Sequence, residues 1–108
     1  MFLFQASILG GKYIIYSNGD IFNAHTKKRI YPHVDKRGYK TVKLYDKERD
    51  PSCSKTTKFS LARLLYFAFH PELDSNDKSL IVLVKDNKVD FTLDDLYVAK
   101  RENKDETL

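Results

Sequence analysis

The chain has 108 residues, a formal net charge of +4 and 42% hydrophobic residues. These values exclude a chain that is disordered throughout and allow one modest hydrophobic core, so we expect a single domain over residues 1–108. A single cysteine, Cys53, excludes an internal disulfide framework and a cysteine-based zinc site. No apolar run is long enough to span a membrane and no secretory signal is evident, so we expect a cytoplasmic protein.

The first third of the chain has the pattern of short strands joined by turns. Residues 12–17 (KYIIYS) are β-branched and aromatic, and Asn18-Gly19 is a strong hairpin signal between this segment and the next. The strands expected here span residues 2–9, 12–17, 20–23 and 29–32.

Residues 36–71 carry most of the pattern that bears on function. Alternate residues from Tyr39 to Tyr45 fall on one face, and Lys40, Val42 and Leu44 fall on the other, which predicts a half-buried strand over residues 38–46. A second strand is expected over residues 55–60, after a polar loop.

A short amphipathic helix follows these strands. Its apolar residues recur at intervals of three and four from Leu61 to Phe69, which gives one apolar stripe. Ser60 has the hydroxyl of an N-cap residue, and Pro71 closes the segment.

Beyond Pro71 the chain becomes acidic. Residues 1–70 hold 13 Lys and Arg against 5 Asp and Glu (+8), and residues 71–108 hold 6 against 10 (−4), which together give the net +4. The apolar run Leu80–Val84 predicts a strand buried on both faces. A turn at Asp86-Asn87, a helical turn after Thr92, an extended segment over 96–100 and a frayed tail over 101–108 complete the chain. The expected fold class is α+β, a small antiparallel sheet packed by one short helix and followed by a hairpin.

Three stretches, in this order, resemble the small HNH homing endonucleases of phages, which join a modular DNA-binding segment to a ββα-metal nuclease core. They cover about residues 12–103 and read YIIYSNGDIFNAHTKKRIYPHVDKRGYKTVKLYDK, KFSLARLLYFAFHP and LIVLVKDNKVDFTLDDLYVAKREN. The resemblance implies a basic sheet and helix for DNA binding over residues 1–70 and an HNH-like segment over 71–100. It also implies a phage-encoded protein acting in the host cytoplasm.

The catalytic positions of that family do not match. The family's metal ligand and general base, an Asp or Asn followed by His, fall on Val82 and Leu83. Its paired Asn residues fall on Asp90 and Phe91, and Asp95 is the one conservative match. The expectation is therefore a degenerate nuclease core, with no catalytic residue, no bound metal, no cofactor and no enzyme activity.

A non-catalytic DNA-binding protein of regulatory or accessory role is the first hypothesis, because a basic segment suits the phosphates of duplex DNA. Most of the cations would contact phosphates, while Tyr39 and Tyr45 would either reach bases or pack across strands. This hypothesis requires Lys36, Arg37, Lys40 and Lys43 to share one exposed surface. The predicted DNA-binding residues are Lys27, Lys28, Arg29, Lys36, Arg37, Tyr39, Lys40, Lys43, Lys58 and Arg63.

Two alternatives stay open at this point. The acidic second part of the chain also suits a small protein that binds and inhibits a host protein, which would show an exposed apolar patch rimmed by polar groups. A weak residual endonuclease is the other alternative.

Overall fold

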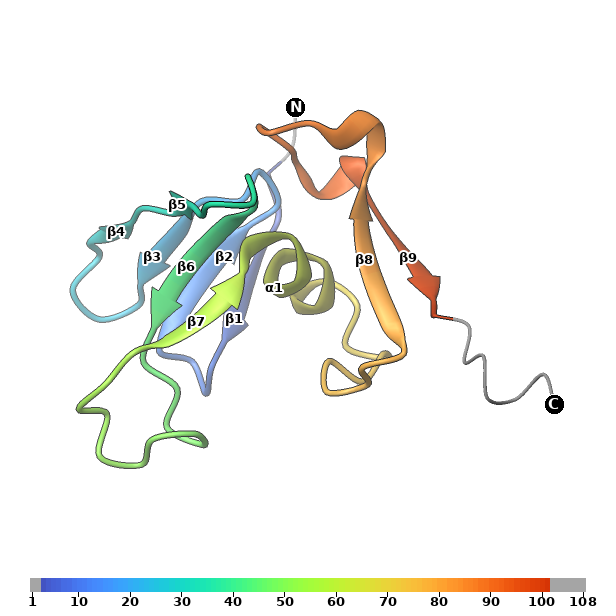
Figure 1. Cartoon of the computed structure of the whole chain (residues 1–108). Helices are drawn as coiled ribbons and strands as arrows, with labels where there is room; N and C mark the ends of the chain where they lie inside the picture. The colour runs from blue at the N-terminus through green and yellow to red at the C-terminus, as the bar shows by residue number, and fades with distance from the viewer. Residues whose placement is uncertain (1–2, 102–108) are drawn as a thin grey trace, which may run out of the picture.

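The computed structural model describes residues 3–101 and contains three antiparallel sheets around one α-helix (Figure 1). The first sheet has the order β1-β2-β3-β4, and the second has the order β5-β6-β7. The strands of the first sheet are β1 (Gln5–Ile8), β2 (Tyr13–Tyr16), β3 (Ile21–Asn23) and β4 (Arg29–Ile30). The strands of the second sheet are β5 (His33–Val34), β6 (Lys40–Leu44) and β7 (Thr57–Ser60).

The hairpin between β2 and β3 forms where Asn18-Gly19 predicts it. Gly19 has φ +94°, a conformation that glycine adopts without steric cost. The Asn18 side chain accepts a hydrogen bond from the Asp20 amide at 3.0 Å, and Ile15 pairs with Ile21 across the turn. Local turn chemistry therefore fixes the register of the first sheet.

Helix α1 (Leu61–Ala68) follows β7 without a linker. The Ser60 hydroxyl accepts a hydrogen bond from the Arg63 amide at 3.4 Å, which confirms the predicted N-cap. Leu61 and Leu65 of α1 are buried against strands of the first and second sheets. The inward residues of these two sheets, such as Ile15, Val42 and Leu44, form one core with the two leucines.

The hairpin of β8 (Leu80–Val84) and β9 (Leu96–Lys100) stands on the other side of α1 (Figure 1). Val82 and Val84 pack towards the core, but Leu83 and its cross-strand partner Tyr97 are exposed. The prediction that residues 80–84 are buried on both faces is therefore wrong. Two strands packed on one helix bury a single face, and within the described residues nothing covers the other.

The α+β class, with small antiparallel sheets and one helix, is confirmed. Two short 3₁₀ turns, η1 (Lys85–Asn87) and η2 (Leu93–Asp95), connect β8 to β9. Most of the tail predicted to fray, from residue 102 onward, lies outside the described residues. Among the residues described, no helix is long and apolar enough to cross a membrane.

Candidate nucleic-acid interface

The outward face of the second sheet is polar and open. On β6 the side chains alternate, so that Val42 and Leu44 enter the core while Thr41 and Lys43 point away from it. Their cross-strand partners extend the same face. We call this surface the outer sheet face; it consists of His33, Tyr39, Thr41, Lys43, Lys58 and Ser60.

Lys43 and Lys58 lie directly opposite each other on this face. Directly opposed side chains of neighbouring strands lie about 4.5–5.5 Å apart at Cβ, and like charges there destabilise the strand pair. Lys58 has one carboxylate nearby, because its Nζ is 3.9 Å from Asp35. Within the described structure Lys43 has no ion-pair partner. An anionic ligand would relieve this repulsion.

The turn between β5 and β6 adds two exposed cations, Lys36 and Arg37. The Asp35 carboxylate accepts hydrogen bonds from the amides of Arg37 at 2.9 Å and Tyr39 at 3.0 Å. The Tyr39 amide is the main reason why the pKa of Asp35 lies below its ordinary value. The Asp35 carboxylate therefore stabilises the backbone of this turn, and the side chains of Lys36 and Arg37 are exposed to solvent.

The two tyrosines of β6 and its flanks are exposed rather than buried. Tyr39 is 62% exposed, and the Arg37 guanidinium lies 5.7 Å from its ring centroid. Tyr45 is 38% exposed, and Lys12 Nζ lies 4.9 Å from its ring centroid. Each ring makes a cation–π contact with a basic side chain and lies at the boundary with solvent.

Lys40 does not share this surface. It points to the inward side of β6, where its Nζ is 2.7 Å from Asp90 and 5.9 Å from the Phe91 ring centroid. The prediction that Lys36, Arg37, Lys40 and Lys43 form one exposed surface is therefore wrong at Lys40. Strand alternation places it with Val42, and Asp90 of the η1–η2 connection supplies its counter-charge.

The Arg63 side chain makes its hydrogen bonds within the fold. Its guanidinium donates hydrogen bonds to the carbonyl oxygens of Leu80 at 2.6 Å, Ser75 at 2.7 Å and Asp77 at 3.0 Å. It also lies 4.7 Å from the Phe67 ring centroid. These bonds tie the segment before β8 to α1, so the predicted phosphate contact is not available to the same donors.

The predicted residues of the first sheet form a separate group. Lys27 and Lys28 are exposed in the turn between β3 and β4. Arg29 pairs with Asp20 at 2.8 Å and lies 4.9 Å from the Tyr31 ring centroid. The structure thus brings together Lys36, Arg37, Tyr39, Lys43 and Lys58, and it separates them from Lys40, Arg63 and this group.

Four cations of residues 1–70 were not among the predicted residues: Lys12, Lys47, Arg49 and Lys55. Lys47, Arg49 and Lys55 belong to the loop between β6 and β7, and Lys12 precedes β2. Residues 47–55 hold three Lys or Arg against two Asp or Glu, so the sequence gives only a weak basic signal there.

The connection between β8 and β9 contains the acidic residues Asp90, Asp94 and Asp95 of the expected HNH-like segment. The Asp95 carboxylate accepts hydrogen bonds from the Thr92 amide at 2.9 Å and from Lys88 Nζ at 3.0 Å, and Asp90 pairs with Lys40. Within residues 3–101 there is no group of three or more His, Cys, Asp or Glu side chains placed to hold a metal ion.

We expect Asp95 to make the stability of this hairpin depend on pH. The Thr92 amide and then Lys88 lower the pKa of Asp95 from its ordinary value of 3.8. The stabilisation by the ionised carboxylate is therefore complete above pH 3.8 and is lost as the pH falls towards the lower folded-state pKa. Asp95→Asn should lose less thermal stability than the parent protein between pH 5 and pH 3.

The neighbouring Asp94→Asn is the matched control for this measurement, because Asp94 is exposed on the same turn. An equal acid sensitivity of Asp95→Asn and the parent protein would contradict the role given to Asp95.

Comparison with known proteins bears on this site through structure alone. No protein-family model and no curated protein sequence matches the chain. A solved structure, described as DNA binding and cleavage by the HNH homing endonuclease I-HmuI, is similar with a TM-score of 0.68 and 21% sequence identity. At this identity the similarity concerns the fold alone, and the fold of this chain is like that of the solved structure. The match covers 93% of this chain and 53% of the other, so this chain spans about half the length of the endonuclease.

This similarity corrects one prediction. The expectation that this chain is not an enzyme is contradicted, because the similar structure is that of a nuclease. The side chains at Val82, Leu83 and Phe91 do not by themselves show a loss of activity. The confirmed part of the resemblance is the fold.

Proposed function

We propose that this protein binds duplex DNA through the outer sheet face and the turn between β5 and β6. Lys36, Arg37, Lys43 and Lys58 contact backbone phosphates, which position the protein on the duplex. Tyr39 lies among them, where its ring and hydroxyl reach the groove side of the contact. The similar endonuclease is described as binding DNA, which supports the same partner for this chain.

The observation that carries the proposal is the placement of Lys43 opposite Lys58 on an exposed strand pair. Two facing lysines destabilise the strand pair, whereas opposite charges in these positions would stabilise it. A phosphate backbone reverses this effect, since it neutralises both ammonium groups at once.

Lys43→Gln is expected to change stability and DNA affinity in opposite directions. Loss of the repulsion with Lys58 should raise the free energy of unfolding by about 0.2–1 kcal/mol. Loss of one phosphate contact should reduce the magnitude of the salt slope, d log K/d log [salt], by about 0.9. Urea unfolding and fluorescence anisotropy of a labelled duplex measure the two effects.

Lys43→Arg is the control, because it keeps both the charge and the repulsion and should keep the stability and the salt slope close to those of the parent protein. If Lys43→Gln leaves DNA binding unchanged, Lys43 does not contact DNA. If it destabilises the protein, Lys43 has a structural role instead.

Cleavage of the bound DNA is a second candidate, favoured by the description of the similar endonuclease as one that cleaves DNA. Incubation of the protein with supercoiled plasmid and Mg²⁺, followed by gel electrophoresis, tests it. Nicked or linear plasmid that increases with protein concentration supports cleavage, and intact plasmid at full occupancy contradicts it.

A further inference from the structure

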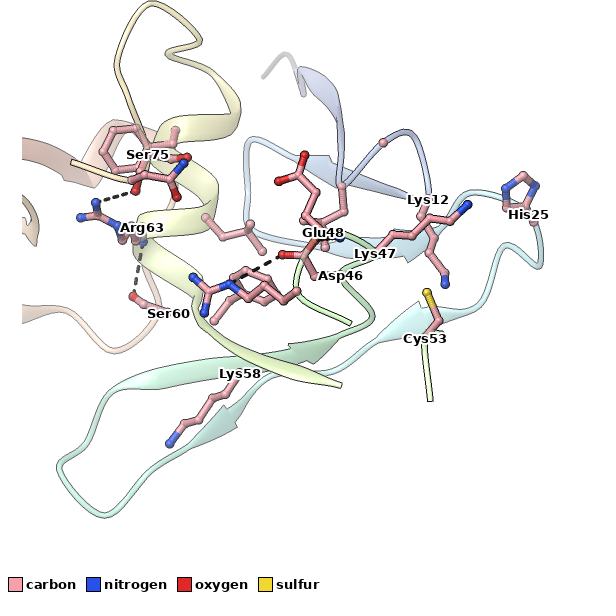
Figure 2. Close-up of a pocket in the computed structure, with 17 residues that line it drawn as sticks. Lys12, His25, Asp46, Lys47, Glu48, Cys53, Lys58, Ser60, Arg63 and Ser75 are labelled. Atoms are coloured by element: carbon pink, nitrogen blue, oxygen red, sulfur yellow. Dashed lines mark hydrogen bonds and ion pairs between the residues drawn. The ribbon is translucent and has the colours of Figure 1, made fainter. Parts of the chain in front are cut away.

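A hollow of about 930 Å³ lies beside the outer sheet face. Its walls are the turn between β1 and β2, the loop after β6, and β7 with one side of α1 (Figure 2). His25 of the turn between β3 and β4 and residues 75–76 complete the lining. Leu9, Phe59, Leu64 and Phe67 supply its apolar lining. Lys58 belongs both to this hollow and to the outer sheet face, so the two surfaces are continuous.

The charge of the hollow is unbalanced towards positive. Five Lys and Arg side chains and two carboxylates line it, namely Lys12, Lys47, Arg49, Lys58, Arg63, Asp46 and Glu48. Figure 2 shows Lys12 and Lys47, together with His25 and Cys53, at the end of the hollow away from Arg63.

The acids of the adjoining loop are used to shape the loop. The side chain of Asp46 is 12% exposed and accepts a hydrogen bond from the Glu48 amide at 3.1 Å. The Asp50 carboxylate accepts hydrogen bonds from the Ser52 hydroxyl at 2.7 Å and the Lys55 amide at 2.8 Å. The Ser52 hydroxyl is the first cause of the lowered pKa of Asp50.

The cations of the same loop stay available. Arg49 is 66% exposed and only 3.9 Å from Asp46, a loose pair, and Lys47 is exposed with no ion pair among the described residues. Lys12 Nζ is held over the Tyr45 ring, at the boundary with the sheet. Asp46 and Asp50 therefore hold the backbone of the loop, whereas Lys47 and Arg49 stay exposed beside the hollow.

We propose that this hollow holds a phosphodiester backbone of the duplex that the outer sheet face binds. This inference rests on the proposed function and adds Lys12, Lys47 and Arg49 to the contacting residues. Charge complementarity selects a polyanion, and continuity through Lys58 allows one duplex to contact both surfaces. A strand seated here covers Cys53, which lines the hollow and is the single cysteine of the chain.

Cys53 provides the test, because its rate of modification by Ellman's reagent reports on the hollow alone. A saturating random duplex should slow modification of the parent protein several-fold. The variant K12Q/K47Q should bind the duplex more weakly, with a salt slope smaller in magnitude by about 2, and should lose the protection at a DNA concentration that again saturates it. Lys47→Gln alone should show an intermediate effect.

The possible failures are distinguishable. If Cys53 is not protected when the protein is saturated with DNA, the DNA does not bind in the hollow, and the proposal that the outer sheet face binds DNA is unaffected. If inorganic phosphate at the same phosphate concentration protects Cys53 equally well, the hollow binds free phosphate and not a DNA strand. No DNA binding at all overturns the proposed function and the hollow together.

Discussion

Arg63→Met is expected to lower the free energy of unfolding by about 2–3 kcal/mol, because it leaves partly buried carbonyl oxygens without their charged donor. The methionine keeps an unbranched apolar side chain against Phe67 but has no donor for Leu80, Ser75 and Asp77. The carbonyls of Leu80 and Asp77 are partly buried, so water replaces the guanidinium poorly there. Urea unfolding measures the loss.

Arg37→Met is the matched control, because Arg37 is an exposed arginine whose described side-chain contact is with the Tyr39 ring. It should change stability by less than about 0.5 kcal/mol. Hydrogen exchange adds a local readout, since Arg63→Met should speed exchange in β8 more than in β6. Equal stabilities of the two variants would contradict the anchoring role of Arg63.

Removal of four cations from the proposed DNA surface is expected to have the largest effect on affinity. The variant K36Q/R37Q/K43Q/K58Q should bind a random duplex at least about 100-fold more weakly at 50 mM salt, with a salt slope smaller in magnitude by about 3–4. The reason is that each of these side chains neutralises a phosphate in the proposed complex. Fluorescence anisotropy across a salt series measures both quantities.

The charge-matched control is K78Q/K85Q/K100Q/R101Q, which removes four exposed cations from the acidic part of the chain. It lowers the net charge equally, so it accounts for long-range attraction without touching the outer sheet face. Equal losses in the two variants would mean that net charge, and not this surface, determines binding.

The secondary structure could be predicted from the sequence because its signals are local. Asn18-Gly19 specifies its hairpin, Ser60 caps α1, and the alternation from Tyr39 to Tyr45 marks β6. Each of these depends on residues within a few positions of one another.

The candidate site was predicted less well, because its errors come from contacts between distant residues. Lys40 meets Asp90 across 50 positions, and Arg63 reaches carbonyls 12 to 17 positions away. The apolar run of β8 does not reveal that a two-stranded hairpin leaves Leu83 and Tyr97 exposed. The hollow is assembled from five separate segments, so no local pattern indicates it.

The central claim is that the outer sheet face binds duplex DNA through its phosphates. The most direct test is the affinity of the parent protein for a labelled random duplex between 50 and 200 mM salt. Four phosphate contacts predict a linear decrease of log K with log [salt] and a slope of about −3.6 or steeper. No binding at 50 mM salt, or an affinity that does not change with salt, would contradict the claim.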